Sequence, residues 1–115
     1  MTSHHISFSI DSGFEEIFGI LKKQFGNVYS KDLGRFNKLR NGVILGQKLF
    51  FRTNSDAAIS IFLEELSLEE TQIEMISFAA GLSLTLGVLS SYTDDVLAFL
   101  KYEGFEIESF KESNQ

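Results

Sequence analysis

Apolar and polar residues alternate along most of this chain, which is the pattern of half-buried β-strands. Residues 5–10 place Ile6, Phe8 and Ile10 on one side and serines on the other. The same alternation predicts further strands over 28–39, 43–53, 57–66 and 71–80, with a short last strand near 105–107. We expect a bulge at Gly34, where the apolar period breaks.

Two segments change to the three- and four-residue spacing of an amphipathic helix. The first stripe, which ends at Gly26, is Phe14, Ile17, Phe18, Leu21 and Phe25. Ser12 to Glu15 has the form of a capping box at its start. The second stripe is Tyr92, Val96, Phe99 and Leu100, with Leu97 at its border. We expect Ser91 to cap this second helix and Gly104 to end it.

The order of these elements predicts an α+β fold. Asn41-Gly42 is a strong hairpin signal, and Ser67 to Glu70 has turn composition. Strands joined by hairpins form an antiparallel sheet, and each helix has only one apolar stripe to bury. We therefore expect a single domain over 1–115, with both helices on one face of a two-layer sandwich. The ends, 1–4 and 111–115, are expected to fray.

Residues 75–93 carry no charge and are nearly long enough to span a membrane. Leu82, Leu84 and Leu86 alternate there with Ser83, Thr85 and Gly87, which favours an extra strand over a spanning helix. We expect no membrane span. Residues 75–89 fit an inner strand or a covered loop, and they also fit an apolar edge that pairs with a second copy. In the second case Leu82, Leu84 and Leu86 form a homodimer interface.

Composition removes whole classes of chemistry. The chain has 115 residues, 43% of them apolar, with twelve Phe, no Cys and no Pro. A disulfide, a thiolate zinc site and a cysteine nucleophile are therefore excluded. No basic start precedes an apolar core at the N-terminus, and with the lack of Cys this favours a cytoplasmic location. The Phe residues fit a closed core, and they also fit the lining of a cleft for an apolar ligand.

Charge is distributed unevenly. The net charge is −6, but residues 22–52 hold eight of the ten bases and one acid, a local +7. Cross-strand pairing with acidic neighbours explains such a segment, and so does a basic face for an anionic partner. The candidate ligand-binding residues in this segment are Arg35, Arg40, Arg52, Phe36 and Phe50. The overall negative charge makes nucleic acid an unfavourable partner.

The remaining polar residues offer no catalytic, metal or cofactor motif. His4 and His5 are the only histidines, and we expect both on the surface near the N-terminus. Glu64, Glu65, Glu69, Glu70 and Glu74 gather around one predicted hairpin. A solvated rim explains these glutamates, and a cation site or carboxylate catalysis is the alternative. No Walker loop, dinucleotide fingerprint or nucleophile elbow is present.

The run from Leu49 to Ala58, together with Tyr102-Glu103-Gly104-Phe105 after a helix, resembles a family of small bacterial α+β proteins of unknown function. The resemblance spans about residues 5–107. It implies an α+β fold and a cytoplasmic location, and it brings no catalytic or binding residue.

These observations favour a non-enzymatic cytoplasmic interaction domain that associates with itself as a homodimer. One alternative is a carrier or sensor of a small apolar or amphipathic anionic ligand. Another is an acidic inhibitor or immunity-type partner of a basic protein, which would use the acidic hairpin at 64–74. Carboxylate catalysis stays open, although the sequence leans away from an enzyme.

Overall fold

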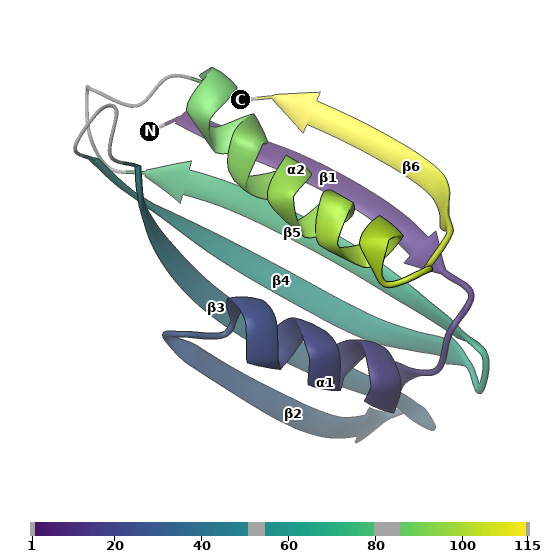
Figure 1. The fold of residues 1–115 in the computed structure, drawn as a ribbon. Coiled ribbons are helices and arrows are strands. Elements are labelled where there is room, and N and C mark those ends of the chain that lie inside the picture. Colours follow the sequence, from purple (N-terminus) through teal and green to yellow (C-terminus); the bar gives the residue numbers. More distant parts are fainter. Residues whose placement is uncertain (1, 51–54, 80–85, 115) are drawn as a thin grey trace.

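The computed structural model describes residues 2–50, 55–79 and 86–114. Within them, two helices lie over a six-stranded antiparallel sheet in the order β2-β3-β4-β5-β1-β6 (Figure 1). The elements in chain order are β1 Thr2–Ile10, α1 Phe14–Phe25, β2 Tyr29–Phe36, β3 Leu39–Phe50, β4 Ser55–Ser67, β5 Glu70–Ala79, α2 Leu86–Tyr102 and β6 Ile107–Asn114. The predicted two-layer α+β sandwich is confirmed.

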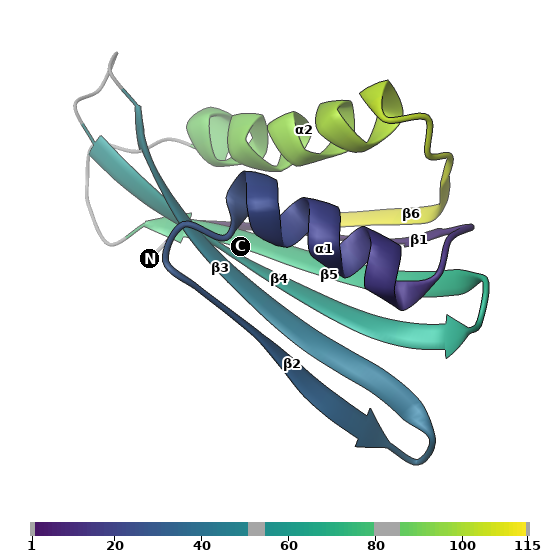
Figure 2. The same ribbon diagram turned by 60° about the horizontal axis from the view of Figure 1, so that its bottom comes forward.

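Both helices pack on the same face of the sheet and form one layer (Figure 2). Helix α1 contacts β3 and β4, and α2 contacts β1 and β5. The sheet residues beneath them are buried and almost all apolar: Ile6, Phe8, Ile10, Ile44, Ile59, Ile61, Leu63, Ile73 and Met75. The two helical stripes predicted from sequence are confirmed, since Ile17, Leu21, Val96 and Leu100 are fully buried against this face.

The hairpin between β2 and β3 turns at Asn37-Lys38, whose φ angles are 52° and 71°. Two central residues with positive φ are what a tight hairpin turn requires. The predicted turn at Asn41-Gly42 is therefore wrong, and both residues lie inside β3. Gly42 serves packing instead, because a Cβ there would lie 2.8 Å from Phe18 Cε2 and 2.9 Å from Phe14 Cζ.

The predicted bulge is confirmed by the register shift between Asp32 and Gly34.

The capping box predicted before α1 is not formed. Gly13 occupies the N-cap position without a side-chain hydrogen bond, and Ser12 Oγ donates to Glu16 Oε2 at 3.0 Å instead. The predicted end of α1 is confirmed, since the Gly26 N–H donates to the Lys22 carbonyl at 3.0 Å. Acids in the first turn and lysines in the last complement the helix dipole without a capping side chain.

Helix α2 begins at Leu86, five residues before the predicted cap at Ser91. Ser91 and the acids that follow it therefore lie inside the helix, and no acid occupies its first turn. Residues 86–90 belong to this helix, so the extra strand predicted over 81–90 is wrong for that half, and 80–85 lie outside the described residues. Leu89 lies three residues before Tyr92 and therefore continues the helical spacing toward the N-terminus. The alternation of Leu82, Leu84 and Leu86 favoured a strand in this segment instead.

Both ends of the chain are paired in the sheet. His4 pairs with Asn114 across β1 and β6, in segments where fraying was predicted. Strand β6 is also longer and later than the predicted strand at 105–107. The predicted end of α2 is confirmed, because Gly104 has φ +95° and the Phe105 N–H donates to the Leu100 carbonyl at 3.0 Å. Among the described residues, no helix combines the length and apolarity needed to cross a membrane.

Close packing of α1 on β3 gives a test of this arrangement. A Cβ at Gly46 would lie 2.2 Å from the Phe25 carbonyl oxygen, a backbone atom that has little room to move. We expect Gly46→Ala to lower the free energy of unfolding by about 1–3 kcal/mol, as overpacking does. Urea denaturation followed by circular dichroism measures it.

The matched control is Gly19→Ala in α1, where a Cβ meets nothing within 4 Å. This change should raise stability by about 0.5–1 kcal/mol, because alanine favours a helix over glycine. Equal effects of the two substitutions would contradict the close approach at Gly46.

Candidate functional site

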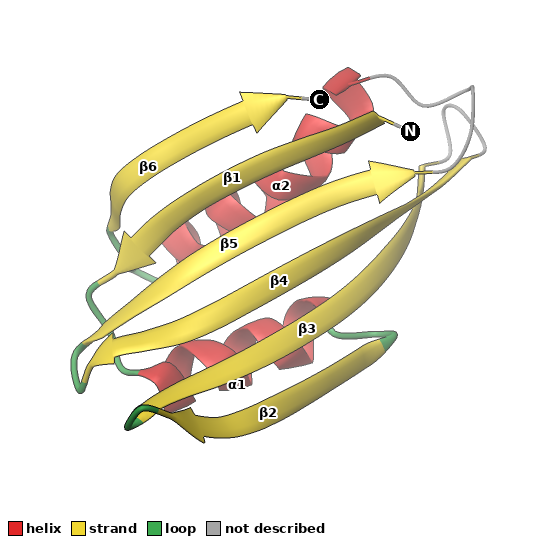
Figure 3. Cartoon of the chain, turned by 180° about the vertical axis from the view of Figure 1, so that it is seen from behind, coloured by secondary structure: helices red, strands yellow, loops and turns green. Residues whose placement is uncertain are grey.

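The face of the sheet opposite the helices carries no covering element among the described residues (Figure 3). We call it the open face. An antiparallel sheet with one face in water normally shows polar side chains on that face. Here the strands β2 to β5 depart from that rule.

Ten apolar side chains on β2 to β5 point to the open face, and we call them the apolar belt. They are Tyr29, Leu33, Phe36, Leu39, Val43, Leu45, Ala58, Phe62, Ile76 and Phe78. Phe62 is 45% exposed and Phe36 is 62% exposed. Clusters of exposed apolar side chains are typical of interaction surfaces, so the belt is a candidate binding surface.

The register of the strands aligns these residues in rows across the sheet. In one row Val43 lies beside Phe62, and in the next Tyr29 lies beside Leu45. Near the β2–β3 hairpin, Leu33, Phe36 and Leu39 line a hollow of about 410 Å³. A smaller hollow of about 110 Å³ lies beside Phe62 in the middle of the belt.

Polar side chains frame the belt. On β1 the open-face residues are serines and a histidine, namely Ser3, His5, Ser7 and Ser9, and on β6 they include Lys111 and Ser113. Within the rows of the belt, polar side chains also point to the open face: Lys31 on β2, Asn41 and Gln47 on β3, Ser60 and Glu64 on β4, and Gln72 and Glu74 on β5. Glu74 Oε1 is 3.7 Å from His5 Nε2. The belt is thus confined to four of the six strands, with Lys31 on its β2 side and Glu74 on its β5 side.

Sequence reasoning missed the belt, although a signal was present. Ile61-Phe62-Leu63 and Met75-Ile76 place apolar residues at consecutive positions of a strand. Since successive side chains point to opposite faces, such runs indicate that both faces avoid water. The alternation within each strand predicted that only one face of the sheet is buried.

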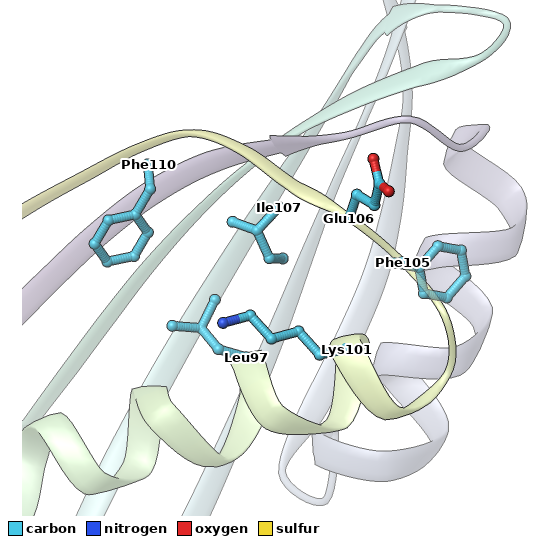
Figure 4. Close-up of a pocket in the computed structure, with 6 residues that line it drawn as sticks. All are labelled: Leu97, Lys101, Phe105, Glu106, Ile107 and Phe110. Atoms are coloured by element: carbon cyan, nitrogen blue, oxygen red, sulfur yellow. The ribbon is translucent and has the colours of Figure 1, made fainter.

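A second candidate is a groove of about 580 Å³ between α2 and β6 (Figure 4). Its lining is Leu97, Lys101, Phe105, Glu106, Ile107 and Phe110. The Lys101 side chain extends toward Leu97 within the groove, whereas the Glu106 carboxylate points away from it. In the described part of the chain, Lys101 forms no ion pair. The groove thus offers apolar walls and one free ammonium group.

His4 is buried at 1% exposure, so the predicted surface position is wrong for this histidine. Its Nε2 donates to Glu112 Oε2 at 2.6 Å, and the Thr93 hydroxyl donates to its Nδ1 at 2.7 Å. An ionised carboxylate can only accept, which assigns the Nε2–H direction, and Nδ1 of the neutral ring then accepts from the Thr93 hydroxyl. Hydroxyl, imidazole and carboxylate follow the order of a nucleophile relay, but Thr93 is fully buried. The three residues therefore tie β1, α2 and β6 together.

Two of the predicted ligand-binding residues are engaged by carboxylates. Arg35 Nη1 donates to Glu65 Oε1 at 2.8 Å, and Arg40 pairs with Asp32 and with Glu15. The hydrogen bond from Arg40 lowers the pKa of Asp32 below its usual range, and the Gly34 N–H acts in the same direction. The charges of Arg35 and Arg40 are thus compensated by neighbouring acids.

The structure does not bring the predicted ligand residues together. Arg40 stacks over the Phe14 ring at 4.7 Å on the helix side, whereas Phe36 lies in the apolar belt. Arg52 lies outside the described residues, and the side chain of Phe50 is not described. A ligand site built from these five residues stays a prediction.

The predicted homodimer interface lies in and next to residues 80–85, which are outside the described residues. Leu82 and Leu84 lie outside the described residues, and Leu86 is the first residue of α2, with its side chain not described. That interface stays a prediction. In the described ranges, no group of three or more His, Asp or Glu is arranged to hold a metal ion.

Tyr92 is buried where α2 meets the end of β3. Burial raises the pKa of its hydroxyl to about 12, and the nearby Asp95 carboxylate adds to the shift. Lys48 Nζ lies 5.9 Å from the centre of the Tyr92 ring and pairs with Asp95. Tyr92 therefore stays protonated at neutral pH and anchors the helix.

Comparison with protein-family models, curated proteins and solved structures found no match to this chain. The resemblance to a family of small bacterial α+β proteins therefore stays a prediction.

The buried histidine gives a test with its neighbour as control. We expect His4→Ala to lower the free energy of unfolding by about 1–3 kcal/mol, since it removes a buried ring and its hydrogen bonds. His5, whose side chain is 38% exposed, should change stability by less than about 0.5 kcal/mol when replaced by Ala. Urea unfolding of both variants measures the difference, and equal effects would contradict the buried contact.

Proposed function

We propose that this protein is a non-enzymatic interaction domain that binds a partner through the apolar belt of its open face. The observation that carries this proposal is the half-exposed row of Val43 and Phe62 at the centre of a sheet face that the helices leave uncovered. Aromatic and aliphatic anchors surrounded by a polar rim are the usual anatomy of a protein interface.

The polar groups of the structure support the same proposal. His4, Thr93 and Glu112 are committed to one another, and Arg40 is committed to carboxylates. Groups held in this way stabilise the fold. The belt, by contrast, has apolar side chains that gain free energy by leaving water.

The belt can be tested in the cells that make the protein. Phe62→p-benzoylphenylalanine places a photoreactive benzophenone group at the centre of the belt, on a side chain that is already 45% exposed. We expect irradiation to produce a covalent adduct with the bound partner, which is detected as a heavier band and identified by its mass.

The control is the same replacement at Tyr102, an exposed aromatic residue at the end of α2. It should give no adduct, because it lies on the helix side of the molecule. Equal adducts at both positions, or none at Phe62, would overturn the open face as the binding surface.

The groove between α2 and β6 favours a second candidate function, the binding of a small amphipathic anion. Lys101 would meet the acid group, and Leu97, Ile107 and Phe110 would contact the apolar part. Such a pairing of one charged group with apolar walls is typical of small-ligand sites. In this candidate, the carrier or sensor function would use Lys101 to bind the acid group, in place of the arginines predicted from the sequence.

Decanoate is a suitable probe for the groove. We expect its titration to raise the melting temperature and Lys101→Met to weaken binding by about tenfold, the effect of losing one charge-assisted contact. Lys111→Met, at an exposed lysine outside the groove, is the control and should leave binding unchanged. Isothermal titration calorimetry that shows no binding to the unaltered protein would reject this function.

A further inference from the structure

We propose that the partner of the open face is a second copy of this chain, related by a two-fold axis that runs along the strands between β3 and β4. In this arrangement β3 faces the partner's β4, and β2 faces the partner's β5. The inference rests on the proposed function of the open face and adds the identity of its partner.

The position of the axis follows from where the apolar belt lies. The belt occupies β2 to β5, so its midline falls between β3 and β4. Rotation about that midline places Val43 opposite Phe62 of the other copy and Tyr29 opposite Ile76. The same rotation places Leu45 opposite Ser60 and Asn41 opposite Glu64, so the contact also contains polar residues. The polar open faces of β1 and β6 then extend beyond the contact and stay in water.

The charges of the belt select the same axis. Lys31, Val43, Phe62 and Glu74 form one row across four strands, so Lys31 and Glu74 are about 14 Å apart within one chain. The proposed rotation places each Lys31 opposite Glu74 of the other copy. Because a two-fold contact repeats every pair, the dimer contains two such pairs of opposite charge.

Other two-fold axes bring unlike surfaces or like charges together. An axis between β4 and β5 would place Val43 opposite Ser7 and Lys31 opposite Lys111. An axis that runs across the strands along the Lys31 row would place Lys31 opposite Lys31 of the other copy and Glu74 opposite Glu74 of the other copy, which brings like charges together. The axis along the strands between β3 and β4 avoids both conflicts.

The size of the belt sets the expected strength of the dimer. Four strands at about 4.8 Å spacing and five open-face rows cover roughly 500 Å² in projection, and side-chain relief makes the accessible area larger. Standard interfaces bury about 800 Å² per partner. A dimer at the small end of this range, with a micromolar dissociation constant, is therefore expected.

Exchange of the two charges tests the axis directly. Lys31→Glu and Glu74→Lys should each weaken dimerisation by at least about tenfold, because each brings two like-charge pairs into contact. An equal mixture of the two variants should dimerise again, since every pair in the mixed dimer has opposite charges. Sedimentation velocity up to about 100 μM measures all of these states, a range that covers micromolar dissociation constants.

Lys111→Glu makes the same charge change on the open face of β6, outside the belt, and should leave the dimer intact. If the unaltered chain dimerises but the mixture of variants does not recover, the proposed axis is wrong. If the unaltered chain stays monomeric, the second copy is overturned as partner. An adduct of Phe62 with a different protein would then leave the proposed function of the open face standing.

Discussion

The packing of both helices against one face of the sheet is the constraint on which the rest of the structure depends. Each strand from β3 to β5 carries apolar residues on both faces, but the helices bury only one. Ile61 and Leu63 are buried beneath the helix layer, whereas Phe62 between them is half exposed. The belt is thus the face of these strands that the helix layer leaves uncovered.

The helix layer can lie close to the sheet because β3 contributes two glycines beneath α1. Gly42 receives the rings of Phe14 and Phe18, which stack at 5.4 Å, and Gly46 lies against the end of the same helix. Side chains at these positions would separate α1 from β3 and expose Ile44 between them. Local backbone geometry and the burial of the core are therefore coupled in one strand.

The sequence predicted the two helix stripes and the two-layer α+β class well, because burial of one face of an element imposes a regular spacing of apolar residues. The prediction from sequence was wrong where the same residue type is typical of two different structural positions. Gly42 after Asn41 has the composition of a turn, but contact with α1 decides its place, and that contact joins distant segments. His4 was misplaced for the same reason, since its partners, Thr93 and Glu112, lie at the other end of the chain.

The buried histidine also gives the belt a defined border. His4 joins β1 to β6 and α2, so these contacts hold β6 beside β1, the strand that pairs with β5. The open faces of β1 and β6 are polar, and a polar rim around an apolar centre is typical of interfaces. The apolar belt ends at β5 because the next strand alternates serine with core residues, so β1 serves both the core and the limit of the belt.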